Sequence, residues 1–342
     1  MCSTHSNGLR RVEKLRKSFL LLIITIVSLV FVACANKPSQ GLIQNESIKK
    51  QQSVEENKEL KIALVMKTLT NPFFIAMEKG GRKAEKEFGV KLIVKTGAME
   101  TSIEQQIGIV EELISMKVDA IVIAPGSSTE LVSVLKKAQD ANIKIVNIDN
   151  RLDVDLSQKI GLLNVPFISV KNDEGAYLSA KYIADMIQNP VNAAILEGIR
   201  TADNAQQRKN GAYKAFSENA NIKIVASETA NWKIDEAYSV ATNMFATHPD
   251  IKAIFCANDM MALGVLQYLK DSKKNDVLVA GFDNLDDAKA VLRDGTMAVT
   301  IDQQPEVQGY LGIKYAVELI NGRSVAPETY VSVKVVSKKE LE

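Results

Sequence analysis

Polar side chains that could bind a small neutral molecule recur in this 342-residue chain directly after short apolar runs. The clearest case is the stretch 253–266, AIFCANDMMALGVL, in which Asn258 and Asp259 separate an apolar run from a helical pattern. A buried strand that leads into a helix places such residues at the carboxyl end of the strand, where open α/β sheets bind ligands. Comparable polar groups follow other apolar runs, at 67–71, 149–151, Asp283 and 302–304.

The chemistry of these groups predicts a carbohydrate ligand. Carboxylates and amides can each hold two hydroxyl groups, and an unmatched buried hydroxyl costs about 1–3 kcal/mol. Aromatic residues accompany the polar groups, namely Phe73, Phe74, Trp232 and Phe282. Such a mixture suits a sugar ring, whose edge carries hydroxyls and whose faces are C–H. No glycine-rich phosphate loop follows a strand.

Strands and helices alternate from Glu59 onward. The strands read as continuous apolar runs, which is typical of parallel sheets covered on both faces. A closed eight-stranded barrel is an alternative, but the near-repeat of two halves favours two doubly wound lobes.

Composition excludes several other classes of protein. The net charge of +1 gives no reason to expect a nucleic-acid partner. Three cysteines and two histidines are too scattered for a Cys/His metal site or a disulfide framework, so no metal or cofactor is predicted, although a carboxylate-bound metal stays open. No nucleophile elbow or triad appears. We therefore predict a binding protein rather than an enzyme; a membrane-anchored hydrolase using Asp149 and Asp283 is the weaker alternative.

The N-terminal region predicts export and attachment to a membrane. Residues 1–33 combine a basic start with an apolar run, 19–33, that is shorter than the roughly 20 residues of a membrane span, which indicates a signal peptide. The segment 31–34, FVAC, resembles a bacterial lipobox with Phe31 in place of the usual aliphatic residue, which implies lipidation of Cys34. Residues 34–58 are polar and read as a disordered tether. An uncleaved single-span anchor is the alternative; in either case the bulk of the chain lies outside the cytoplasm.

Four motifs in order resemble the type I periplasmic sugar-binding proteins of the ribose-binding kind. They are KTLTNPFF at 67–74, NDMMALG at 258–264, GFD at 281–283 and TIDQ at 300–303, and the resemblance covers 60–342. It implies a monomer that captures one monosaccharide (pentose, hexose or polyol) between two lobes, which close by a hinge, and delivers it to an ABC permease. Lactose-repressor-type regulators share the fold but carry an N-terminal DNA-binding helix pair, where this chain has a signal and tether. A sensor that presents its closed form to a chemoreceptor or sensor kinase is the alternative.

The resemblance also implies the domain boundaries. The N-terminal lobe is expected at 59–162 plus 304–332, and the C-terminal lobe at 163–303 plus 333–342. The three strands of the hinge are expected to cross near 162–164, 303–304 and 331–333.

Carried over position by position, the resemblance implies a set of ligand contacts. They are Lys67, Asn71, Phe73, Phe74, Asp149, Asn150, Gln206, Trp232, Asn258, Phe282, Asp283 and Gln303. Three positions depart from the family pattern: Asn150 and Gln206 stand where the family has arginines, with Arg151 and Arg208 close by, and Lys67 replaces a small polar residue. These departures bear on which sugar is bound.

Some of these residues also have structural interpretations. Asn71 could cap the helix that begins at Pro72, which is compatible with ligand contact. Asp259 is interpreted as a helix cap, and one of Phe73 and Phe74 as a core residue. Trp232, the only tryptophan of the chain, lies in a polar loop and is predicted to stack on the ligand.

Overall fold

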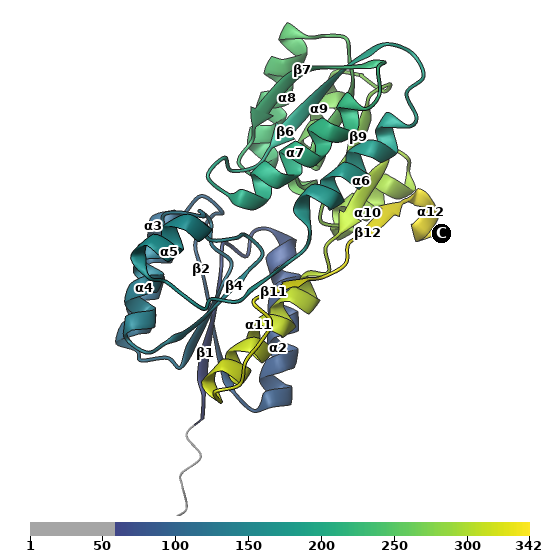
Figure 1. Ribbon diagram of the computed structural model, residues 1–342. Coiled ribbons are helices and arrows are strands. Elements are labelled where there is room, and N and C mark those ends of the chain that lie inside the picture. Colours follow the sequence, from purple (N-terminus) through teal and green to yellow (C-terminus); the bar gives the residue numbers. More distant parts are fainter. Residues whose placement is uncertain (1–58) are drawn as a thin grey trace, which may run out of the picture. The chain divides into compact units, whose positions relative to one another are not determined.

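Residues 59–342, the part that the computed structural model describes, contain two six-stranded sheets (Figure 1). The strand orders are β11-β5-β4-β3-β1-β2 and β12-β10-β9-β8-β6-β7. Neighbouring strands are parallel, except that β10 and β12 run antiparallel. The predicted signal peptide, tether and lipidated Cys34 lie outside the described residues.

The first lobe is built on the sheet that contains β1. Its strands are β1 (Lys61–Met66), β2 (Lys91–Thr96), β3 (Ala120–Ile123), β4 (Lys144–Ile148), β5 (Phe167–Ser169) and β11 (Glu328–Tyr330). Its helices are α2 (Pro72–Phe88), α3 (Ile103–Ser115), α4 (Val132–Asp140), α5 (Val154–Ile160) and α11 (Pro305–Ile320).

Helices cover both faces of this sheet, as Figure 1 shows. Leu64 of β1 belongs to an apolar cluster with Met77 of α2. The next residue, Val65, points to the other face, in a cluster with Val110 of α3 and Leu135 of α4. Because successive side chains of a strand alternate between faces, a strand buried on both faces must be apolar throughout. This explains the continuous apolar runs in the sequence.

The second lobe repeats the same architecture. Its strands are β6 (Val191–Glu197), β7 (Ile222–Thr229), β8 (Ile251–Cys256), β9 (Leu278–Ala280), β10 (Val299–Asp302) and β12 (Lys334–Ser337). Its helices are α6 (Asn172–Ala184), α7 (Asp203–Ser217), α8 (Ile234–Thr247), α9 (Asp259–Asp271), α10 (Asp286–Arg293) and α12 (Lys338–Leu341). Helices α6 and α7 pack closely: a Cβ atom on Gly211 would lie 2.1 Å from the carbonyl oxygen of Asp173, so only glycine fits there.

Three connections join the two sheets, at 170–171, 303–304 and 331–333. Two of them are bonded to each other, because Gln304 Nε2 donates to the carbonyl oxygen of Ser332 at 2.6 Å. Gln304 itself adopts a left-handed backbone conformation, with φ of 50°.

The first crossing differs from the prediction. It was expected near 162–164, but β5 pairs with β4 and β11, so residues 163–169 belong to the first lobe. The sequence gives little sign of β5, since its three residues are too few to show a period. The extended run expected at 329–336 is likewise divided, into β11 and β12 on opposite sides of a crossing.

None of the helices within residues 59–342 combines the length and the apolar character that crossing a membrane requires.

Candidate ligand-binding site

A small cavity lies where side chains from both lobes meet at the carboxyl ends of the strands. It is lined by Lys67, Asn71, Phe73, Phe74, Glu100, Asp149, Asn204, Arg208, Trp232, Asn258, Asp283 and Gln303. The side chains leave a cavity volume of about 20 Å³, enough for about one water molecule. A ligand of sugar size therefore needs these side chains to move apart when it binds.

The structure brings together most of the residues that the sequence predicts. Lys67, Asn71, Phe73, Phe74, Asp149, Trp232, Asn258, Asp283 and Gln303 all line the cavity, whereas Asn150, Gln206 and Phe282 do not. Glu100, Asn204 and Arg208 line it although they were absent from the predicted set.

The first lobe contributes a buried ion pair to the cavity wall. Lys67 Nζ lies 2.8 Å from Asp149 Oδ2, and the two side chains are 2% and 3% exposed. The ammonium group also lies 5.7 Å from the ring centre of Phe74 and 5.9 Å from that of Trp232. Burying two charges is costly unless they are paired, so each partner depends on the other.

Asn71 caps helix α2, as predicted, and its side chain also lies in the cavity wall. Its Oδ1 accepts a hydrogen bond from the backbone N–H of Phe73 at 3.0 Å, which caps α2, while its side chain lines the cavity. Its Nδ2 donates to Glu100 Oε1 at 2.9 Å. Burial raises the pKa of Glu100, while the charge of Lys67 and the bond from Asn71 oppose the shift. Glu100 lies in the loop that follows β2, so the rule that located the other polar groups could also have found it.

Arg208 organises the second-lobe half. Its guanidinium donates to Asn172 Oδ1 at 2.8 Å, to the carbonyl oxygen of Ala257 at 2.9 Å and to Gln303 Oε1 at 3.3 Å. Asp283 Oδ1 lies 3.6 Å from Nη1. Burial lowers the pKa of Arg208, and the nearby carboxylates, Asp283 first, oppose this shift. Burial also raises the pKa of Asp283, against the effect of the Arg208 charge.

The predicted contact Phe282 lies behind Arg208. The guanidinium carbon is 3.8 Å from the ring centre of Phe282, which is fully buried. Phe282 therefore supports the arginine from the side away from the cavity.

Gln206 of α7 does not line the cavity, whereas Arg208 of the same helix does. It donates to the carbonyl oxygen of Arg200 at 2.8 Å and is partly exposed. Two residues of an α-helix are about 200° apart around its axis, so Gln206 and Arg208 project from opposite sides.

Asn150 is buried at the junction of the two lobes rather than in the cavity. Its Oδ1 accepts from the backbone N–H of Asn204 at 3.2 Å, and its Nδ2 donates to the carbonyl oxygen of Pro125 at 3.0 Å. The neighbouring Arg151 is directed to the hinge, where it donates to Tyr330 Oη at 3.0 Å and pairs with Glu328 at 2.6 Å.

Asn258 caps helix α9, because its Oδ1 accepts from the backbone N–H of Met261 at 2.9 Å. The sequence-based interpretation of Asp259 as the cap is therefore wrong: the capping residue is Asn258. Asp259 instead accepts bonds from the Thr300 hydroxyl at 2.7 Å and the Leu285 N–H at 2.9 Å, and burial raises its pKa to about 6.

Three cavity residues have strained backbones. Asp149, Trp232 and Asp283 have φ values of 62°, 67° and 133°, a region that residues other than glycine seldom adopt. Such conformations cost about 1–3 kcal/mol each and cluster at functional sites, where the surrounding structure enforces them.

Trp232 fits only because residue 198 is glycine. A Cβ atom at Gly198 would lie 2.0 Å from the indole ring. We expect Gly198→Ala to displace the ring and to lower the free energy of unfolding by about 1–3 kcal/mol, the usual effect of overpacking. Urea unfolding followed by the fluorescence of the single tryptophan measures both effects. Gly108→Ala is the control, since nothing lies within 4 Å of a Cβ there; an unchanged emission maximum and midpoint in Gly198→Ala would contradict the expected clash.

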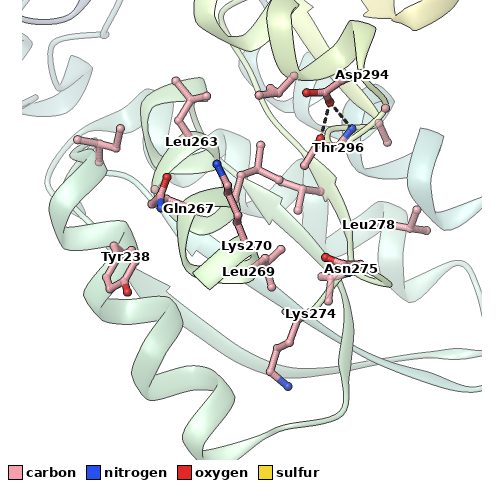
Figure 2. A pocket seen from close by; sticks show the side chains of 18 of the residues that line it. Tyr238, Leu263, Gln267, Leu269, Lys270, Lys274, Asn275, Leu278, Asp294 and Thr296 are labelled. Carbon is pink, nitrogen blue, oxygen red and sulfur yellow. Dashed lines mark hydrogen bonds between the residues drawn. The ribbon is translucent and has the colours of Figure 1, made fainter. Parts of the chain in front are cut away.

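A larger hollow of about 1190 Å³ opens on the second lobe between α8, α9, α10 and β9. Figure 2 shows Tyr238, Gln267 and Lys270 on its wall, with Thr296 donating hydrogen bonds to Asp294. None of the predicted contacts lines it. The predicted contacts therefore gather in the smaller of these two spaces.

Comparison with known proteins defines the class. The chain matches the periplasmic binding protein domain family over residues 62–324 and belongs to that family. The fold is the type I form, and the family acts outside the cytoplasm. The prediction of a binding protein rather than an enzyme is confirmed by this membership.

Among its relatives, the D-ribose/D-allose-binding protein of Pseudomonas aeruginosa is 42% identical over 269 residues, which are 77% of this chain and 83% of the relative. The D-allose-binding periplasmic protein of Escherichia coli is 35% identical, over 78% of this chain and 86% of its own. A solved solute-binding protein from Actinobacillus succinogenes with bound D-allose is 41% identical, with a TM-score of 0.78, and covers 82% of this chain and 99% of its own.

Proposed function

We propose that this chain is the substrate-binding protein of an ABC importer and that it captures one aldose of the allose or ribose type. The observation that carries the proposal is the composition of the cavity wall, in which charged groups, amides and aromatic rings from both lobes converge on one small space. The names of the relatives, which refer to D-allose and D-ribose, support the same class of ligand.

The chemistry of the lining suits a sugar ring. Asp149, Asp283 and Glu100 can accept hydrogen bonds from hydroxyl groups, and Arg208 and Lys67 can donate to oxygens. The rings of Phe73, Phe74 and Trp232 offer flat apolar surfaces to C–H faces.

Closure of the lobes completes the site. Ser128 of the first lobe donates its backbone N–H to the carbonyl oxygen of Thr201 at 3.1 Å, and its Oγ accepts from the backbone N–H of Asp203 at 3.0 Å. Because the lining residues come from both lobes, a ligand would enter an open form and be enclosed by a hinge motion about the three crossings. The closed form would then present the surface that a permease recognises.

The proposed setting is a membrane surface. Lipidation at Cys34 would hold the protein there as a monomer, with 34–58 as a tether between the lipid and the lobes. These features rest on the sequence alone.

A ligand panel tests the proposed function. Binding to the folded state alone stabilises by about 2.7 kcal/mol when the ligand concentration is 100 times the Kd. We therefore expect D-allose or D-ribose at saturating concentration to raise the melting temperature by several degrees, with polyols and disaccharides as comparison ligands. A shift with an amino acid or a nucleoside, and none with any aldose, would refute the proposed substrate class.

A further inference from the structure

Asn204 lies in the cavity wall, and its side-chain oxygen is a buried hydrogen-bond acceptor without a partner. The residue is 2% exposed, and its Oδ1 makes no hydrogen bond. A buried polar atom is normally paired, because leaving it unpaired forfeits its interaction with water. Since the side chain lines the cavity, the missing partner is expected to come from a ligand.

The backbone of Asn204 is held in place by the opposite lobe. Its N–H donates to Asn150 Oδ1 at 3.2 Å, and Asn150 is in turn anchored by its bond to the carbonyl oxygen of Pro125. The neighbouring N–H of Asp203 bonds Ser128 Oγ at 3.0 Å. These contacts cross from one lobe to the other, so lobe closure sets where Asn204 lies relative to the first-lobe half of the cavity.

Trp232 carries the complementary feature. Its Nε1 is a donor that is buried without a partner, in a residue that is 4% exposed and also lines the cavity. A ligand that satisfies both atoms must offer a hydroxyl hydrogen to one and an oxygen to the other. Sugar hydroxyl groups provide both functions.

We propose, on the basis of the sugar-binding function above, that Asn204 is a specificity residue whose Oδ1 accepts a hydrogen bond from one particular hydroxyl of the bound aldose. Since an acceptor cannot bond to an ether or a C–H group, the site discriminates against analogues that lack that hydroxyl. Asn150 is a positioning residue that acts through Asn204. The sequence departs from the family arginine at position 150, and in this chain the amide there serves lobe closure.

The test is a set of calorimetric titrations in which protein variants and sugar analogues are changed separately and together. The wild-type protein, Asn204→Ala and Gln206→Ala are each titrated with D-allose, or with D-ribose if it binds more tightly, and with its monodeoxy analogues. Gln206 lies on the same helix outside the cavity, so its variant is the matched control.

We expect Asn204→Ala to weaken binding of the parent sugar by about 10-fold or more, as is usual for a lost hydrogen bond to a buried group. One deoxy analogue should show a similar loss with the wild-type protein but no further loss with Asn204→Ala. Gln206→Ala should match the wild-type protein throughout. If Asn204 contacts one hydroxyl directly, the losses of binding free energy from the variant and from the deoxy analogue are non-additive for that hydroxyl alone. A general effect on lobe closure would instead give additive losses for every analogue.

The alternative results are separable. If the wild-type protein binds none of the aldoses, the proposed function fails first. If it binds them and Asn204→Ala loses nothing, or loses the same factor for every analogue, the assignment of Asn204 is wrong while the function stands. Melting curves without sugar check folding, and Asn204→Ser, which keeps a small polar side chain, takes the place of the alanine variant if that variant is unfolded.

Discussion

Replacing Arg208 with leucine is expected to abolish measurable sugar binding and to destabilise the second lobe. The guanidinium holds Asn172, the carbonyl oxygen of Ala257 and Gln303 together and lies 3.6 Å from Asp283. Its removal leaves the buried Asp283 without a compensating charge. Breaking such a buried network costs about 3–5 kcal/mol, and loss of a buried charged contact to the ligand weakens binding by at least about 100-fold.

Two control variants sharpen this prediction. Arg208→Lys keeps the charge but not the forked donor set, so it should fall between wild type and Arg208→Leu in both melting temperature and affinity. Arg293→Leu, at the exposed end of α10, should change stability by less than about 0.5 kcal/mol. Calorimetric binding of Arg208→Leu within threefold of wild type would show that the arginine is not part of the site.

Lys67→Met is expected to have the second largest effect. It leaves Asp149 buried and charged beside an apolar side chain, with an expected loss of about 3–5 kcal/mol in the free energy of unfolding. Adding Asp149→Asn should recover most of the stability, because asparagine carries no charge and tolerates the left-handed backbone at this position. The double variant should still bind sugar poorly, since both polar groups of the pair have been changed.

Denaturant unfolding of the single and double variants checks this account. Greater stability of the double variant than of Lys67→Met, together with weak binding in both, is the expected pattern. Equal stability of the two variants would mean that the buried charge of Asp149 is compensated elsewhere.

The general location of the site could be predicted from the sequence because one rule places it. Polar residues that follow apolar strands, such as Asn71, Asp149, Asn258 and Asp283, must meet at the carboxyl edge of a doubly wound sheet. The two lobes followed from the repeated alternation of strands and helices. Both inferences use local patterns, which the sequence displays directly.

The parts that the sequence did not predict depend on contacts between distant segments. Whether Gln206 or Arg208 faces the cavity depends on the helical phase of α7, and the resemblance by position selected the residue that does not line it. Asn150 and Asn204 are 54 residues apart in the chain, and the hydrogen bond between them crosses from one lobe to the other. No local pattern in the sequence indicates such a contact. The first crossing was misplaced because β5 is identified by its strand partners rather than by its own three residues.

The single tryptophan allows the most direct test of sugar capture between the lobes. Trp232 lines the cavity and no other tryptophan contributes to the signal. Titration with D-allose, or with D-ribose if it raises the melting temperature more, should give a saturable change in emission at a ratio of one sugar per chain, and a disaccharide should give none. Sugar that binds by calorimetry but leaves the emission of Trp232 unchanged would contradict the account, because the ligand would then lie outside this cavity.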